Sequence, residues 1–229
     1  VAQGSEFNLL NHNGGSARSD IVSLGNGKIG FVYIEQSTKN LRAYTYDTST
    51  NSLLSDVLID TYSSLDNAYN PGNLSTIEVI KFGTGFGVTH KTGNDFFFTQ
   101  IDSSGSIIKG PTSIYQGTDK VLQVADIGSN KLFVAHTVST DVAAPTSGKI
   151  INLNDFTDDT STKTISSKYL NTDGRLIYDN GKLLYSTLDS SNRNPTIHSL
   201  TITITGTDNI VNIFDKALNT ISEKRAFLG

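Results

Sequence analysis

The sequence predicts an all-β fold, and within that class a β-propeller-like arrangement of four or more blade-like modules of about 45–58 residues. The first observation behind it is composition. Charged residues make up 17% of the 229 residues, below the roughly 25% of average domains, and Ser, Thr, Asn and 20 glycines fill the difference. This composition suits strands and tight turns, and it excludes coiled coils and helical bundles.

The second observation is a loose internal repeat of strand, turn and strand. Apolar segments flank four turns that end at Gly27, Gly85, Asn130 and Gly181. Gly and Asn tolerate the positive φ angles that tight hairpins require. Successive turns lie 58, 45 and 51 residues apart, close to the period of about 40–50 residues typical of four-stranded propeller blades.

The repeat divides the chain into modules at about 17–62, 74–116, 120–170 and 172–215. We expect residues 17–215 to form a single domain. Residues 1–16 are a lead-in that begins like a vector-derived segment and can supply a closing strand, and residues 216–229 are a tail. A β-sandwich or jelly roll stays open as the alternative, because strand-turn-strand patterns are common to all-β proteins.

Charge and residue usage exclude several classes of function. The net charge is −4, and the 18 Lys and Arg residues are scattered singly apart from Lys224–Arg225, so nucleic acid is not an expected partner. Neither a polybasic cluster nor a long apolar run is present, so we expect no membrane insertion. The chain has no cysteine, which excludes disulfides, zinc–thiolate sites and cysteine catalysis.

Acidic residues recur at the start of the modules. Counting back seven residues from each turn gives Asp20, Glu78, Gln123 and Gly174, with Asp173 beside the last. The first strand of each propeller blade lines the central channel, so these side chains would face one another. The three carboxylates could hold Ca²⁺, could serve as the acid and base of a glycosidase, or could point into water. All three interpretations remain open.

A second group of oxygen ligands follows in the third module. Asp155, Asp158 and Asp159 place three carboxylates within five residues. Calcium takes six to eight oxygen ligands, so these residues are a further candidate calcium site. The central Gly and distal Glu of a calcium loop are missing, and turn capping is the competing explanation.

Aromatic and polar side chains recur at a third position. Tyr33, His90 and His136 follow the turns of their modules by five or six residues, and Thr187 holds the same place in the fourth. Tyr and His can offer one apolar and one polar contact, which suits a carbohydrate-binding face.

Two long loops, at residues 60–75 and 139–148, are expected to present further binding residues at one end of the scaffold. The candidates there for contact with a receptor are Tyr62, Asp66, Tyr69 and Asn70.

Modules such as Leu24-Gly-Asn-Gly-Lys-Ile-Gly-Phe-Val-Tyr33, in an acidic chain rich in Ser, Thr and Asn, resemble the receptor-binding spike-tip and fibre-head domains of bacteriophages, the marine corticoviruses among them. The resemblance implies a non-enzymatic, extracellular domain on the virion surface. Such a domain would attach to a host receptor or glycan and be stabilised by calcium.

Two other functions stay open. A secreted glycoside hydrolase would need two of Asp20, Glu78 and Asp173 within about 5–10 Å of each other. A purely structural domain of a larger assembly would need neither a site nor a ligand. The chain lacks Trp, the aromatic platform that sugars favour, which counts against both carbohydrate interpretations.

Overall fold

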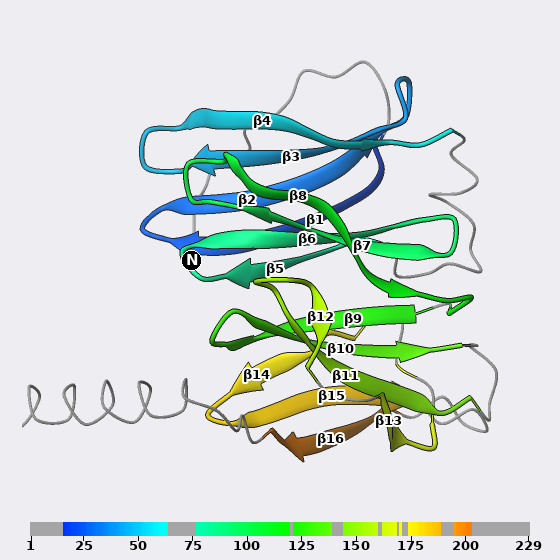
Figure 1. Cartoon of the computed structure of the whole chain (residues 1–229). Coiled ribbons are helices and arrows are strands. Elements are labelled where there is room, and N and C mark those ends of the chain that lie inside the picture. The colour runs from blue at the N-terminus through cyan, green and yellow to red at the C-terminus, as the bar shows by residue number, and fades with distance from the viewer. Residues whose placement is uncertain are drawn as a thin grey trace, which may run out of the picture.

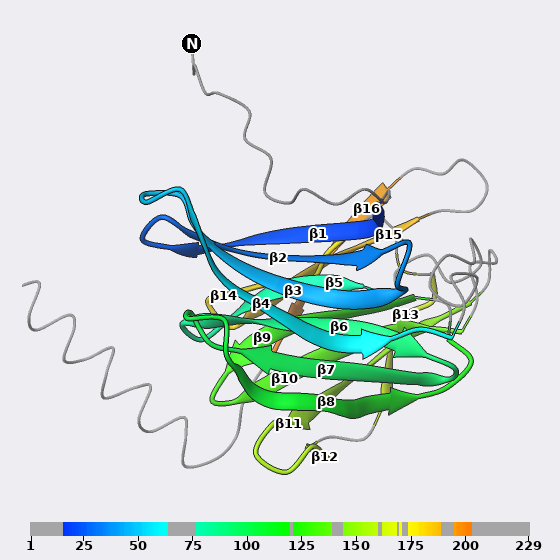
Figure 2. The ribbon, with the colours of Figure 1, turned by 90° about the horizontal axis from the view of Figure 1, so that it is seen from above.

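The computed structural model describes residues 16–63, 77–119, 121–138, 144–159, 162–168, 170, 174–188 and 195–202. These residues form sixteen strands in four antiparallel sheets. Figure 1 shows the sheets following one another in chain order from top to bottom, and Figure 2 shows β15 and β16 running at an angle to β1 and β2. The predicted all-β, propeller-like fold with four blades is confirmed, and the sandwich alternative is not needed.

The first blade is a four-stranded meander whose hairpins have the predicted turn chemistry. Asn26 and Gly27 have φ angles of 50° and 74°, the left-handed conformation that a two-residue hairpin turn needs. Its strands pair in chain order: β1 (Ser16–Gly25), β2 (Lys28–Glu35), β3 (Asn40–Asp47) and β4 (Ser52–Thr61).

The second blade repeats this meander. Two of its glycines are required by close packing, since a Cβ at Gly85 would strike the Ile101 carbonyl and one at Gly87 would strike the Phe98 ring. Residues 83–87, with glycine at every second position, therefore form a packed hairpin. The strands pair in chain order: β5 (Glu78–Phe82), β6 (Gly85–Thr92), β7 (Asp95–Ile101) and β8 (Ile107–Gln116).

The last two blades are less regular at their outer edges. In the third, two short strands both pair with β11, and in the fourth three strands are described. The third blade contains β9 (Val121–Gly128), β10 (Lys131–Thr137), β11 (Thr146–Asn152), β12 (Thr157–Asp158) and β13 (Lys163–Ser166). The fourth contains β14 (Ile177–Asp179), β15 (Lys182–Leu188) and β16 (Pro195–Thr201).

Three apolar clusters hold the blades together, one between each successive pair. Phe86 of the second blade packs against the first, and Phe98 packs toward the third. On β10, neighbouring Leu132 and Phe133 enter different clusters, as side chains that alternate across a strand must. Burial of each such side chain stabilises the fold by about 1.5–3 kcal/mol.

The first strands of the blades meet in the middle of the molecule. Strand β1 contacts β5, β5 contacts β9, and β9 contacts β14. Because each blade presents its first strand to the next, the residues at the start of these strands lie around a common centre, here called the axial site.

Candidate functional site

The repeat places Asp20, Glu78 and Gln123 at one structural position. In each hairpin, the residue opposite this position comes directly before the Tyr or His that we expected to bind a ligand. The opposed pairs are Asp20 with Val32, Glu78 with Thr89, and Gln123 with Ala135. The alignment predicted from the sequence therefore corresponds to a real equivalence of register, and all three side chains belong to the axial site.

Glu78 is the most deeply buried carboxyl of the axial site, with 6% of its surface exposed. Its Oε2 accepts a hydrogen bond of 3.2 Å from the Val124 backbone N–H, and its Oε1 has no partner among the described residues. Burial raises the pKa of Glu78 to about 8, and the Asp20 carboxylate adds to this effect while Val124 and Arg175 oppose it. Glu78 is therefore mostly protonated at neutral pH.

Asp20 is held by an ion pair and two backbone donors. Its Oδ1 pairs with the Arg175 guanidinium and accepts from the Ile21 N–H at 2.9 Å. Its Oδ2 accepts from the Val79 N–H at 2.7 Å, and Arg175 Nη1 donates to the Val79 carbonyl at 3.0 Å. These contacts join the first, second and fourth blades, and a guanidinium occupies the space beside Asp20 where we expected a cation.

Gln123 supplies the third contact of the axial site. Its Nε2 donates to the Gly174 carbonyl at 2.6 Å, which links the third blade to the segment that leads into the fourth. Asp173, the remaining predicted ligand, lies outside the described residues.

An open cavity of about 290 Å³ adjoins these groups. Its ionisable and phenolic lining residues are Glu78, Lys81, Asp126, Arg175 and Tyr178. The cavity therefore offers one mostly protonated carboxyl, a second carboxyl and two cationic side chains. This combination can donate a proton, accept one and hold the hydroxyl groups of a ligand.

Asp126 was not among the predicted site residues. Its Oδ1 accepts from the Gly128 N–H at 2.8 Å and its Oδ2 from the Gly83 N–H at 3.3 Å. An Asp two residues before a turn glycine looks like an ordinary turn cap in the sequence. The contact with Gly83, 43 residues away, is tertiary and leaves no sequence signal.

The carboxylates of the third blade lie beside lysines and do not converge on a common centre. Asp158 pairs with Lys149 at 2.7 Å and Asp159 with Lys131 at 3.1 Å, while Asp155 accepts from Thr157. In the described part of the chain, no group of three or more acidic, His or Cys side chains is placed to hold a metal ion. Calcium binding stays a prediction.

The two predicted binding histidines lie in the interior, between blades. His90 Nε2 lies 3.1 Å from Asp60 of the preceding blade. His136 Nδ1 lies 3.0 Å from Asp119, which follows the last strand of its preceding blade. We call these two contacts the His–Asp latches.

The pKa values of the two aspartates in the latches are lowered. The hydrogen bond from His90 lowers the pKa of Asp60. Burial acts to raise the pKa of Asp119, but the hydrogen bonds from His136 and Tyr115 outweigh it and lower that pKa. The latches are therefore hydrogen-bonded links between one blade and the chain of the blade before it.

The aromatic candidates are also buried. Tyr33 is 3% exposed and bonded to the Tyr44 hydroxyl at 3.0 Å, and Tyr62 is 2% exposed and packs edge-on against His90. Their role in receptor binding stays a prediction. The loop candidates Asp66, Tyr69 and Asn70 lie outside the described residues.

Comparison with protein-family models and with curated proteins finds no match. Among solved structures, the chain is similar to an α-L-arabinofuranosidase from Podospora anserina in complex with cellotriose, with a TM-score of 0.45 and 13% identity over 82% of this chain and 65% of the enzyme. It is also similar to an α-L-arabinofuranosidase from Lactobacillus brevis, with a TM-score of 0.46 and 10% identity over 83% of this chain and 70% of that enzyme.

A third similar structure is an α-L-arabinofuranosidase from Clostridium thermocellum, with a TM-score of 0.42 and 11% identity over 82% of this chain and 68% of the enzyme. All three are enzymes, which runs against the prediction of a domain without enzymatic activity, and that prediction is not repeated. At identities of 10–13%, the similarity concerns the fold alone. None of the described residues forms a helix long and apolar enough to span a membrane.

Proposed function

We propose that this domain hydrolyses glycosidic bonds at the axial site, with Glu78 as the general acid and Asp126 as the second carboxyl. The observation that carries the proposal is a buried glutamic acid, with a pKa raised to about 8, that lines an open cavity. A general acid must hold its proton at the working pH and release it to the leaving oxygen. Glu78 meets the first requirement because burial disfavours its charged form.

The second carboxyl, Asp126, lines the same cavity as Glu78. Glycosidases place their two carboxyls about 5–9.5 Å apart. Glu78 accepts a hydrogen bond from Val124 on β9, and Asp126 lies two residues further along that strand. Two residues of a strand advance by about 6.6 Å, which places the Asp126 backbone about that far along β9 from the N–H group that Glu78 accepts from. Asp126 therefore takes the role of base or nucleophile.

Asp20 and Arg175 act as positioning residues. Asp20 and Asp126 both accept two backbone hydrogen bonds, but Asp20 is also ion-paired with Arg175, whereas Asp126 has no ion pair among the described residues. Asp20 is therefore the less available of the two carboxylates. Its charge raises the pKa of Glu78 and that of Arg175 lowers it. The Arg175 side chain is 47% exposed, which leaves guanidinium donors for substrate hydroxyls. Tyr178 adds an aromatic ring to the cavity lining, against which a sugar can pack.

The decisive experiment measures hydrolysis of a panel of aryl glycosides and polysaccharides by the wild type and by Glu78→Gln, Asp126→Asn and Asp20→Asn. Loss of the acid is expected to lower kcat by about 10²–10⁴-fold for poor leaving groups. The loss should be much smaller for dinitrophenyl glycosides, whose leaving group needs no proton. Asp126→Asn should be slow with every leaving group.

Glu35→Gln is the matched control, because Glu35 ends β2 and its Oε2 accepts a hydrogen bond from the Thr38 hydroxyl, outside the axial cavity. Two results would contradict the proposal. In the first, Glu78→Gln and Glu35→Gln are equally active on every substrate. In the second, the wild type cleaves none of the panel. Attachment to a host receptor or glycan, and the resemblance to phage spikes, stay predictions beside this proposal. The chain spans 65% of the length of the Podospora enzyme.

A further inference from the structure

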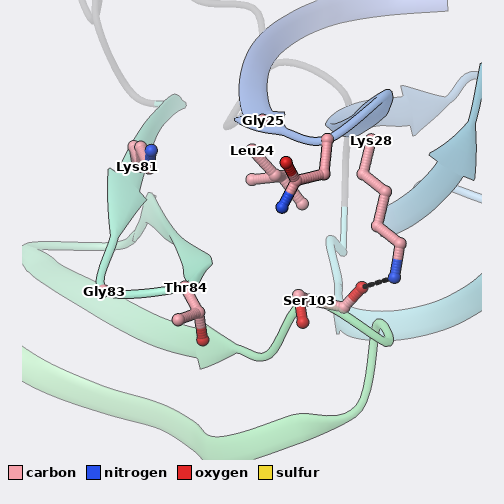
Figure 3. A pocket seen from close by; sticks show the side chains of 8 residues that line it. Leu24, Gly25, Lys28, Lys81, Gly83, Thr84 and Ser103 are labelled. Carbon is pink, nitrogen blue, oxygen red and sulfur yellow. Dashed lines mark hydrogen bonds between the residues drawn. The ribbon is translucent and has the colours of Figure 1, made fainter.

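A second cavity, of about 370 Å³, lies next to the axial one. Three hairpin turns from the first two blades form it: β1–β2, β5–β6 and β7–β8. Figure 3 shows Lys81 and Lys28 on opposite sides of the hollow, with Thr84 and Ser103 between them. Its volume lies within the roughly 300–1,000 Å³ typical of ligand pockets. We call it the lysine cavity.

The lining of the lysine cavity is cationic. It contains two lysines and no acidic residue, in a protein whose net charge is −4. Among the described residues, neither ammonium group lies within 4.0 Å of a carboxylate, and Lys28 Nζ donates to the Ser103 carbonyl at a long 3.4 Å. Asp47 lies opposite Lys28 in the β2–β3 register; its carboxylate is held by the Ser49 hydroxyl and backbone N–H, and Lys28 adds a smaller electrostatic contribution that lowers the pKa of Asp47.

The remaining polar side chains of the lining can each donate a hydrogen bond. Asn26 contributes an amide, and Thr84 and Ser103 contribute hydroxyls. Two positive charges with three polar groups and no negative charge form a surface complementary to an anion. A partly enclosed position strengthens such an attraction, because the effective dielectric is lower there than in bulk water.

The lysine cavity and the axial cavity share one residue, Lys81. Both cavities therefore lie along β5, which begins at Glu78 and carries Lys81 three residues later. Three residues of a strand span about 10 Å. A glycan bound at Glu78 can thus extend along β5 and reach the lysines.

We infer that the lysine cavity binds an anionic substituent, a carboxylate or a sulfate ester, on the glycan that occupies the axial site. The substrate class is therefore an acidic polysaccharide. The inference rests on the proposed function in one respect, namely that the glycan is cleaved at the axial site. The anion-binding site itself is argued from Lys28 and Lys81 alone. Lys28 and Lys81 hold the charge, and the hydroxyls of Thr84 and Ser103 bond to the anion or to neighbouring sugar hydroxyls.

The test is affinity electrophoresis and calorimetry with three oligosaccharide probes: oligogalacturonate for the carboxylate, chondroitin sulfate fragments for the sulfate ester, and neutral arabino-oligosaccharides. Wild-type protein should bind at least one acidic probe more tightly than the neutral probe, and salt should weaken that binding. The double variant Lys28→Gln/Lys81→Gln should bind the preferred acidic probe about tenfold or more weakly. Its binding of the neutral probe should not change.

The controls separate this inference from the proposed function. Lys163→Gln removes an exposed lysine of β13 and should bind like the wild type. Glu78→Gln should still bind the acidic probe, because it keeps both lysines. If the wild type binds this probe but hydrolyses no substrate, the proposed hydrolase activity is refuted and the anion site is not. Preference between the two acidic probes identifies the anion. Equal affinity for acidic and neutral probes, or equal binding by the wild type and the double variant, overturns the inference.

Discussion

Substitution of Glu78 by Gln should make the domain more stable at neutral pH while removing its proton donor. Glutamine has nearly the same shape, and its amide oxygen can accept from Val124 as Glu78 Oε2 does. The Oε1 of Glu78 has no hydrogen-bond partner among the described residues. In the variant, the glutamine NH₂ takes the place of this oxygen and likewise finds no partner there. The main change is therefore the loss of a titratable proton.

The size of the effect follows from linkage. The pKa of Glu78 is raised from 4.5 to about 8 in the folded state, so the folded protein holds this proton more tightly than the unfolded chain. The tighter proton binding of Glu78 adds to the free energy of unfolding. This contribution is fully present below pH 4.5 and falls as the pH rises toward 8, by about 1.4 kcal/mol per pH unit and about 5 kcal/mol in all. By pH 7, about 3 kcal/mol of it has been lost.

The assay is urea denaturation of the wild type, Glu78→Gln and Glu35→Gln at several pH values from 5 to 8. The difference in unfolding free energy between Glu78→Gln and the wild type should grow by about 2–3 kcal/mol from pH 5 to pH 7. The difference in Tm between the variant and the wild type should likewise be larger at pH 7 than at pH 5, by roughly 5–10 °C. Other titrating groups are common to both proteins and cancel in the difference.

A constant difference between the two proteins across this pH range would refute the reasoning, because it would mean that Glu78 titrates alike in the folded and unfolded states. Glu35→Gln should follow the wild type throughout. If it does not, the pH dependence belongs to glutamate removal in general rather than to the axial site.

Three further predictions concern packing, the latches and calcium. Gly85→Ala should lose about 2–3 kcal/mol of unfolding free energy, because the new Cβ meets the Ile101 carbonyl, and a loss below about 0.5 kcal/mol by urea denaturation would contradict this packing. Asp119→Ala should cost about 3 kcal/mol, since it leaves the buried His136 and Tyr115 polar atoms without their acceptor, whereas Asp119→Asn should recover part of that; equal losses for both would argue against the latch. Calcium binding predicts that the Tm in millimolar calcium exceeds that in EDTA by several degrees, and equal Tm values in the two conditions would contradict it.

The architecture could be predicted because its signals are local. A hairpin turn needs residues that tolerate positive φ, and Gly27, Asn130 and Gly181 supply them where the sequence indicated. In the second blade the positive φ falls at Gly83, whereas the predicted Gly85 begins β6. The repeat also placed Asp20 and Glu78 correctly at one structural position, because the register of a hairpin follows from its turn.

The chemistry of the site could not be predicted in the same way. Asp126 resembles a turn cap, and Arg175 stands 155 residues from the carboxylate that it pairs with. His90 and His136 share a strand position with Tyr33, and the sequence does not reveal whether that position faces water or a neighbouring blade. Burial of these side chains depends on blade packing, which is set by contacts between distant segments.

By itself, the sequence determined the fold class, the turn positions, the equivalence of the blades and the acidic residues of the first strands, because these follow from the local backbone preferences and the side-chain alternation of single hairpins. Only the tertiary structure decided which of those acids is neutral, which is paired, and which cavities they line. The physical reason is that the pKa of a carboxyl depends on its distance from water and from other charges. In this protein, those distances are set where three blades meet.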